Sequence, residues 1–400
     1  MNIPKFRYRL QLFFLGLSRD IKTLWGIFNF KKNQNKPPQK ILISGLVLLG
    51  DLVLISPLFQ ALKQEFPEAS IELLVPEGWK IFAQYFKAID QVFEHQKNNP
   101  KWLNLFKKNH KNRWQLGVIP WSYASINLFY ALGISQIRSF PDPKNRKPYR
   151  IHQKINLPQQ ADYFSLMTLA LSSHSSPTQK SYPAPHFDLE KIQKNKLPSS
   201  LSDLISSSYI LIHPGASSPT KYWGAKNYAQ IAHYLISLGY QVILTGTLPE
   251  QRLTQEISDQ ISQTITQPTI NLAGKTKLHE LLALISGAQL VLGPDTGVLH
   301  LTRALNIPSI TLMGPTQALI YGPHPQFHDL KITKSLSVTQ NQNQNQDQPL
   351  SCQNMDTLFK NKIPGVSNCR RSQCLYKNNF CMTDLSEKKV ITFINQILKR

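Results

Sequence analysis

Long hydrophobic runs and cysteine are both scarce in this sequence. No uninterrupted run of about 18 apolar residues occurs, so a membrane-spanning helix is not expected. The N-terminus has a short apolar core near Leu12–Leu17, but charged residues follow it at once and no small-residue cleavage site is present. We therefore expect a cytoplasmic protein that is not exported, with peripheral attachment to the inner face of the plasma membrane left open.

Cysteine occurs only in the last fifty residues, with the spacing Cys-x16-Cys-x4-Cys-x6-Cys (Cys352, Cys369, Cys374 and Cys381). A tight Cys-x2-Cys pair is missing, which favours reduced structural thiols over a zinc site, although zinc stays open. No G-x-G-x-x-G follows a strand with an acidic partner downstream, which argues against an NAD-dependent dehydrogenase.

Acidic residues are few: 23 Asp and Glu stand against 45 Lys and Arg, a net charge of +22. The basic residues gather within 1–40, 97–113 and 138–154. Such a surface attracts polyanions, whether nucleic acid, anionic lipid or phosphorylated glycan, and charge alone does not choose among them. The sequence contains no recognisable nucleic-acid-binding motif, which argues against nucleic acid as the partner.

The N-terminal segment does carry a helical pattern. Its apolar residues recur at helical spacing between Leu10 and Phe28, with Arg9, Arg19 and Lys22 off that stripe. The pattern predicts a helix within residues 5–28 that lies on an anionic membrane or, equally, packs on the first domain. Residues 31–40 read as a linker.

Further on, apolar runs alternate with helical patterns, which predicts βαβ units and a parallel sheet. A helical pattern from the Gly-flanked loop at Gly45–Gly50 runs through Leu62, with Pro57 tolerated near a first turn or kinking the helix. The Ser-, Pro- and Lys-rich stretch 172–203 predicts a domain boundary. We expect strands at 41–44, 71–75, 116–119, 209–212, 241–245, 289–292 and 309–312, and helices at 225–238, 250–261, 277–286 and 297–305.

Four domain-level parts follow: the N-terminal segment 1–40, two α/β domains at 41–190 and 205–335, and a C-terminal part 336–400. The last contains a low-complexity tract at 341–347, the cysteines and a final helix. Two doubly wound domains facing a cleft would bind ligand beyond the carboxyl ends of their strands.

Local chemistry at those strand ends points to a phosphorylated ligand. Asp295, Thr296, Gly297 and His300 lie where a buried strand opens a helix, and free N–H groups with a helix dipole suit a diphosphate there. The alternative is an Asp N-cap with a packed histidine. Lys221 follows a strand-end loop that contains Ser217 and Ser218, and it could balance leaving-group charge or be a solvated loop lysine.

The motifs together resemble glycosyltransferase family 9, the family of the lipopolysaccharide heptosyltransferases, over roughly residues 40–330. They are Leu49-Gly50-Asp51 with Ser56-Pro57-Leu58, Phe66-Pro67-Glu68-Ala69, His213-Pro214-Gly215-Ala216-Ser217 with Lys221-Tyr222-Trp223, Leu244-Thr245-Gly246, Asn271-Leu272-Ala273-Gly274, and Gly293-Pro294-Asp295-Thr296-Gly297-Val298-Leu299-His300 with Gly314-Pro315-Thr316.

The resemblance implies the GT-B fold, two Rossmann-like domains with the acceptor side first and the donor side second. It implies an inverting glycosyltransferase in which Asp51 is the general base, where the residues alone also allow a helix N-cap. It assigns Lys221 to the diphosphate, and Ser217, Ser218, Gly246, Asp295, Thr296, Gly297 and His300 to donor binding. Glu250 is left outside this site because the alignment around it is open.

The predicted partners are a nucleotide-diphosphate-sugar donor, with heptose as one candidate sugar, and an anionic glycan or glycolipid acceptor such as lipopolysaccharide. We expect a monomer with no metal, no cofactor and no nucleic-acid partner. Two alternatives remain: a non-catalytic relative that binds nucleotide-sugar, and a basic nucleic-acid-binding protein.

Overall fold

The chain divides into two compact units, Met1–His186 and Phe187–Arg400, which are described separately. The structure is a computed structural model that describes residues 37–99, 101–110, 113–120, 124–134, 136–139, 153–154, 187–194, 197–205, 208–262, 269–314, 316, 321, 333–336, 382 and 385–398. The predicted helix within 5–28, the four cysteines and the tract 341–347 lie outside the described residues.

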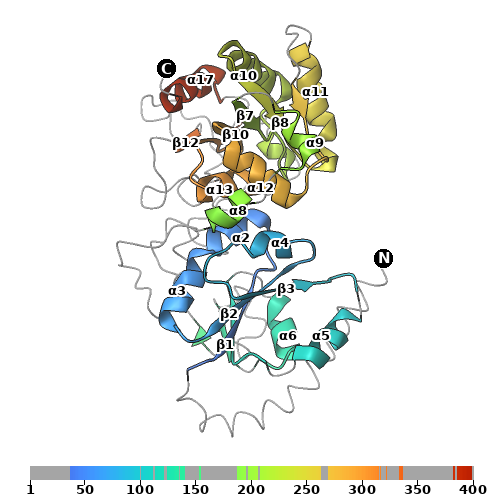
Figure 1. Cartoon of the computed structure of the whole chain (residues 1–400), viewed down its shortest axis with the longest axis vertical. Coiled ribbons are helices and arrows are strands. Elements are labelled where there is room, and N and C mark those ends of the chain that lie inside the picture. Colours follow the sequence, from blue (N-terminus) through green and yellow to red (C-terminus); the bar gives the residue numbers. More distant parts are fainter. Residues whose placement is uncertain are drawn as a thin grey trace, which may run out of the picture. The chain divides into compact units, whose positions relative to one another are not determined.

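The first unit is built on a parallel sheet with the strand order β3-β2-β1-β4-β5-β6. Figure 1 labels its strands β1, β2 and β3. Its central strands are continuous apolar runs because helices cover both faces of such a sheet; Ile41, Leu42 and Ile43 of β1 are fully buried. The strands are β1 (Lys40–Ser44), β2 (Ser70–Pro76), β3 (Gln91–His95), β4 (Leu116–Ile119), β5 (Gln136–Ser139) and β6 (Gln153–Lys154), and the helices α2 (Leu49–Ile55), α3 (Pro57–Glu65), α4 (Lys80–Ala83), α5 (Trp102–His110) and α6 (Ala124–Ala131).

The predicted helix through Leu62 is two helices. The first, α2, ends at Ile55, and α3 begins with Pro57 in its first turn, where a missing backbone N–H costs nothing. Ser56 joins them and donates its hydroxyl to the carbonyl of Val53 at 2.7 Å. Pro57 therefore starts a new helix.

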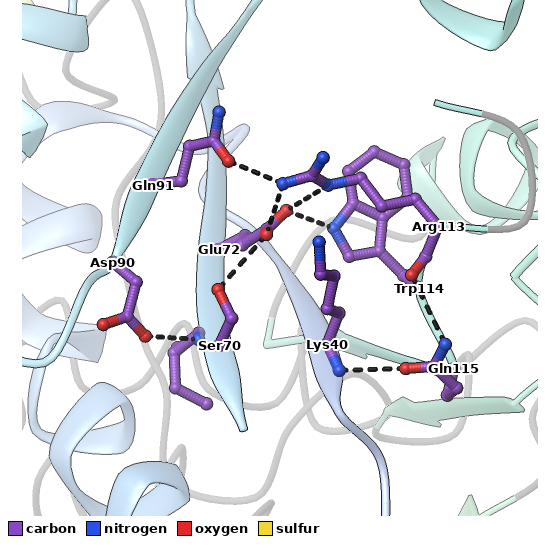
Figure 2. A network of polar contacts seen from close by, with 9 residues as sticks. Lys40, Ser70, Glu72, Asp90, Gln91, Arg113, Trp114 and Gln115 are labelled. Atoms are coloured by element: carbon purple, nitrogen blue, oxygen red, sulfur yellow. Dashed lines mark hydrogen bonds and ion pairs between the residues drawn. The ribbon is translucent and has the colours of Figure 1, made fainter. Parts of the chain in front are cut away.

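A buried carboxylate ties the amino-terminal edge of this sheet together (Figure 2). Glu72, 1% exposed, accepts hydrogen bonds from Arg113 at 2.7 and 2.9 Å and from the indole of Trp114 at 2.7 Å. Arg113 also donates to Gln91 at 2.6 Å. These contacts fix the entry to β2, β3 and β4 and leave the opposite, carboxyl edge of the sheet to the loop that precedes α2.

The second unit repeats the same plan. Its parallel sheet has the order β12-β11-β10-β7-β8-β9, so its first strand lies beside its fourth, as β1 lies beside β4. Its strands are β7 (Tyr209–Ile212), β8 (Gln241–Leu244), β9 (Ile270–Asn271), β10 (Leu290–Pro294), β11 (Ser309–Leu312) and β12 (Thr333–Leu336). Its helices are α8 (Leu189–Lys194), α9 (Ser199–Ser202), α10 (Ala225–Ser237), α11 (Gln251–Ser262), α12 (Leu278–Gly287), α13 (Gly297–Ala304) and α17 (Glu387–Ile397), with single 3₁₀ turns at η3 (Pro219–Lys221) and η4 (Leu248–Glu250).

The C-terminal helix belongs to the core of this unit. Val390 and Ile394 of α17 are fully buried in the cluster that also contains Trp223 and the apolar face of α10. The indole of Trp223 donates to the carbonyl of Leu385 at 2.9 Å. The chain therefore returns to its second sheet after the long segment that follows β12. No helix in the described ranges is long and apolar enough to cross a membrane.

Candidate functional site

The candidate site lies where the strand order of the second sheet reverses. Strands β7 and β10 are neighbours, with Ile212 paired to Leu292, and the N–H of His213 continues the ladder to the carbonyl of Leu292 at 2.9 Å. Parallel neighbours end at the same edge, so the loops that follow them emerge side by side. Connections from β7 and β10 run to opposite sides of the sheet, and ligands bind in the crevice that this creates.

Two glycines allow the segments to approach closely. A Cβ on Gly293 would overlap the backbone carbonyl of His213, and a Cβ on Gly215 would overlap the side chain of Glu250. Gly246, after β8, has Glu250 against it as well, with the nearest atom 3.2 Å from an added Cβ. The edge is therefore packed backbone to backbone, with Glu250 lying over the two loops.

Lys221 turns inward at this edge. The turn η3 begins with Pro219 and ends with Lys221, whose Nζ donates to the carbonyl of Asp295 at 2.9 Å and to its Oδ2 at 3.0 Å. The lysine side chain is 21% exposed and the aspartate side chain 5%. One face of the ammonium group is thus held by Asp295 while the group keeps contact with solvent.

Behind Asp295 lies a buried chain of polar side chains on α13. His300 Nε2 is 3.3 Å from Asp295 Oδ1, and the guanidinium of Arg303 donates to His300 Nδ1. Arg303 also donates to Thr311 Oγ1 and to the carbonyl of Tyr321, each at 2.9 Å. Lys221, Asp295, His300 and Arg303 therefore form one connected network within the second unit.

The charges in this network favour an anionic ligand. Burial alone would raise the pKa of Asp295, but the charge of Lys221, the contact with His300 and the charge of Arg303 hold that pKa well below its ordinary value. Burial, followed by the charge of Arg303, lowers the pKa of His300, so the imidazole is neutral at pH 7. Two cations and one carboxylate then leave the network with one excess positive charge.

The start of α13 adds free donors next to that charge. Thr296 is the N-cap of α13 and makes no side-chain cap hydrogen bond, so the first N–H groups of the helix lack an internal partner. The hydroxyl oxygen of Thr296 is buried without a hydrogen-bond partner among the described residues. Backbone donors, an unsatisfied hydroxyl and a lysine therefore meet at one point, as an oxyanion ligand requires.

The sequence profile of glycosyltransferase family 9 (heptosyltransferase) matches residues 128–362, more than half of the chain. The chain belongs to glycosyltransferase family 9. Lipooligosaccharide heptosyltransferase 2 of Haemophilus influenzae is 27% identical over 292 residues, which cover 69% of this chain and 83% of that protein. Lipopolysaccharide heptosyltransferase 2 of Salmonella typhimurium is 25% identical over 301 residues, with 69% and 83% covered.

Solved structures of the family share the fold. The E. coli ADP-heptose lps heptosyltransferase II matches with a TM-score of 0.67 at 18% identity, over 90% of this chain and 99% of that chain. The glycosyl transferase family 9 protein from Veillonella parvula matches with a TM-score of 0.65 at 19% identity, over 90% and 98%. The predicted fold class, two Rossmann-like domains of the GT-B type, is confirmed.

Within the family 9 fold, three predicted donor-site residues contact one another: Lys221, Asp295 and His300. For Asp295 and Lys221 the structure differs from the alternatives given above, a helix N-cap for the aspartate and a solvated loop residue for the lysine. The N-cap of α13 is Thr296 and not Asp295, and Lys221 is bonded to a buried carboxylate rather than free in solvent. His300 is packed, as its alternative reading expected, and it faces Asp295 as well.

The remaining predicted donor residues lie around this group without joining its network. Gly297 is the first residue of α13, and Ser217 is exposed. Ser218 shares a hydrogen bond with Thr220 at 2.7 Å. Gly246 accepts a hydrogen bond from the N–H of Gly274 at 2.8 Å.

Asp51 lies in the first unit at the corresponding switch point, after β1. The N-cap of α2 is Leu48, so Asp51 is in the first helical turn and not at the N-cap. Gly45 brings the preceding loop against the sheet, where its N–H donates to the carbonyl of Leu74 at 2.8 Å. Asp51 is partly buried and stands at the carboxyl edge of the first sheet.

Sequence reasoning missed Arg303 and set Glu250 aside. Arg303 follows His300 by three residues on one helix, and that spacing puts both side chains on one face. Glu250 closes a capping box at η4 by accepting from the N–H of Thr247 at 2.6 Å and from its hydroxyl at 2.8 Å. Among the described residues, no three His, Cys, Asp or Glu side chains are arranged to hold a metal ion.

Proposed function

We propose that this chain transfers a sugar, with heptose the first candidate, from a nucleotide-diphosphate-sugar to a lipopolysaccharide or other cell-envelope glycan with inversion at the anomeric carbon. The observation that carries the proposal is the ammonium group of Lys221, held on Asp295 beside the open N-terminus of α13. The relatives named above are heptosyltransferases, and the structural relatives include the E. coli heptosyltransferase WaaC with ADP-2-deoxy-2-fluoro heptose.

In the proposed reaction an acceptor hydroxyl attacks the anomeric carbon from the face opposite the diphosphate. Asp51 takes the hydroxyl proton as the new glycosidic bond forms. The bond from the anomeric carbon to the diphosphate oxygen breaks, and the nucleoside diphosphate leaves with the bonding electrons. Lys221 and the first N–H groups of α13 stabilise the negative charge that develops on it.

The proposed donor site accounts for the excess charge of the network. A diphosphate would neutralise the positive charge on Lys221 and Arg303 that Asp295 leaves unbalanced. It would also give the hydroxyl of Thr296 a hydrogen-bond partner. Glu250, which lies over Gly215 and Gly246, is positioned to accept hydrogen bonds from a ribose or sugar hydroxyl at the same edge.

The proposal also covers the acceptor and the location of the reaction in the cell. A phosphorylated glycolipid is a polyanion, and a net charge of +22 would attract it. We propose a cytoplasmic monomer with a peripheral membrane contact through residues 5–28.

A thermal-shift screen with ADP-, GDP- and UDP-sugars tests the donor class, with NAD and a short DNA duplex as controls. We expect one nucleotide-sugar to stabilise the protein by about 2.7 kcal/mol when present at about 100 times its Kd. Stabilisation by DNA alone would instead favour a nucleic-acid-binding protein.

Two variants then separate binding from chemistry. Asp51→Ala is expected to abolish transfer while the affinity for the donor stays near that of wild type. Lys221→Ala is expected to lose affinity for the nucleoside diphosphate itself, because the cation that faces the phosphates is gone. The role of Asp51 is wrong if its variant no longer binds donor, and the role of Lys221 is wrong if its variant binds ADP, GDP and UDP like wild type.

A further inference from the structure

Arg303 stands out because it is a fully buried cation behind the site and not in it. Its side chain is 2% exposed, and burying a guanidinium is costly unless its donors are paired. Thr311 Oγ1 and the carbonyl of Tyr321 hold it from β11 and from the segment that follows. Arg303 is therefore anchored independently of His300, and its Nη2, which donates to Tyr321, also donates to the imidazole.

That contact decides where the proton of His300 resides. A guanidinium group only donates hydrogen bonds, so the Nδ1 that it contacts must be the unprotonated, accepting nitrogen. The neutral ring then carries its proton on Nε2, which faces Asp295 Oδ1 at 3.3 Å. With the proton on Nδ1 instead, the lone pair of Nε2 would face a carboxylate oxygen and repel it.

We propose that Arg303 is a positioning residue: it fixes the Nε2–H tautomer of His300, which orients Asp295 so that its Oδ2 and its carbonyl hold Lys221. Arg303 donates to His300 and Lys221 donates to Asp295; between these pairs, His300 Nε2 lies 3.3 Å from Asp295 Oδ1, a close electrostatic contact that does not have hydrogen-bond geometry. Of these side chains Lys221 is the most exposed, at 21%, against 5% for Asp295 and 6% for His300. The effect of this relay on sugar transfer rests on the proposed function, whereas the tautomer itself does not.

The charged groups around His300 define what happens when Arg303 is removed. Asp295 precedes α13, Arg303 lies on α13, and Lys221 comes from η3. Loss of Arg303 removes a cation that disfavours protonation and frees Nδ1, while Asp295 continues to favour the imidazolium. The pKa of His300 therefore rises relative to wild type, while burial, the largest cause of its lowering, remains.

The tautomer can be read directly by NMR of protein labelled with ¹⁵N-histidine, with the His300 signals assigned by their loss in His300→Gln. In wild type we expect the Nε2–H tautomer, unchanged between pH 8 and pH 6. A wild-type ring protonated on Nδ1, or on both nitrogens at pH 7, overturns the proposal without any further variant. In Arg303→Met we expect loss of the single tautomer; an unchanged tautomer in that variant also overturns the proposal.

The functional arm measures the Kd for ADP-heptose. Arg303→Met is expected to weaken binding roughly tenfold. Arg303→Lys keeps the charge but cannot donate to Thr311, Tyr321 and His300 at once, so we expect a loss of affinity smaller than that of Arg303→Met. Lys388→Met, which removes an exposed cation from α17, is the matched control and is expected to change neither the tautomer nor the Kd.

The NMR experiment and the binding experiment distinguish a wrong tautomer role from a wrong proposed function. If wild type does not bind ADP-heptose, the proposed donor is wrong and the tautomer is still measured. If Arg303→Met folds, alters the tautomer and binds ADP-heptose like wild type, the positioning role of Arg303 is wrong while the proposed function stands.

Discussion

At the scale of single residues, the carboxyl edge of the second sheet, where the candidate site lies, depends on positions at which a side chain cannot fit. Gly215 and Gly293 both lie against neighbours that a methyl group would overlap, but the neighbours differ in kind. At Gly215 the obstacle is the side chain of Glu250, which can move only by giving up its hydrogen bonds from Thr247. At Gly293 the obstacle is the carbonyl of His213, whose backbone is fixed by its hydrogen bond to β10.

We therefore predict that two matched substitutions differ in effect: one mainly lowers stability and the other mainly weakens ligand binding. Gly293→Ala should lower the free energy of unfolding of the second unit by about 2–3 kcal/mol, since the backbone has to move. Gly215→Ala should cost less than about 1 kcal/mol and should instead weaken donor binding, because Glu250 is displaced from the loops. Calorimetry and titration with ADP-heptose measure the two effects, and an equal loss of stability in both variants would contradict the argument.

At the scale of elements, α17 stabilises a unit from which it is distant in sequence. Ile394 is fully buried against the core, and Trp223 and Leu385 are joined across 162 residues. Ile394→Ala should destabilise the second unit by about 2–5 kcal/mol through a lost side chain and the cavity that it leaves. Gln396→Ala, on the exposed side of the same helix, should change stability by less than about 0.5 kcal/mol. Calorimetry should show the loss in the transition of the second unit, and a loss confined to the first unit would refute the assignment.

The elements that were predicted from the sequence are those with a strong local signal. The strands β1, β2, β7, β8, β10 and β11 are apolar runs bounded by polar or glycine residues, and the predicted ranges agree with the structure within two residues at each end. The strand β3 was missed because only Val92 and Phe93 of its five residues are buried. The packing of α17 was not predictable, since no local pattern indicates a partner more than a hundred residues away.

The residues of the candidate site also include some that the sequence could predict and one that it could not. Lys221 and Asp295 are 74 residues apart, yet both follow strands that the parallel alternation makes neighbours, so their meeting could be expected. Arg303 could not be singled out with the same reasoning, because an arginine on a helix is ordinarily at the surface. Its burial follows from Thr311 on the adjacent β11, which is a tertiary contact.

At the scale of the whole molecule, two sheets of identical strand order carry different chemistry at equivalent places. In each, the first and fourth strands are neighbours, and the segment after the first strand holds a residue assigned to the reaction: Asp51 in one unit and Lys221 in the other. Among the described residues, the second unit alone adds a buried carboxylate and a helix with an unsatisfied N-cap hydroxyl at this edge. That asymmetry supports the proposal that the second unit binds the nucleotide.

Hydrogen exchange followed by mass spectrometry can locate that binding in the intact chain. ADP at about 100 times its Kd should stabilise the closed state of the binding segments by about 2.7 kcal/mol, which slows their exchange roughly a hundredfold. We expect this protection in residues 213–224 and 293–304, where η3 and the start of α13 lie, and little change in residues 45–56. NAD at the same concentration is the control, because it carries an ADP moiety with a nicotinamide riboside in place of the sugar. Protection concentrated in residues 45–56 would show that the nucleotide binds the first unit, and Lys221 and Asp295 would then need another explanation.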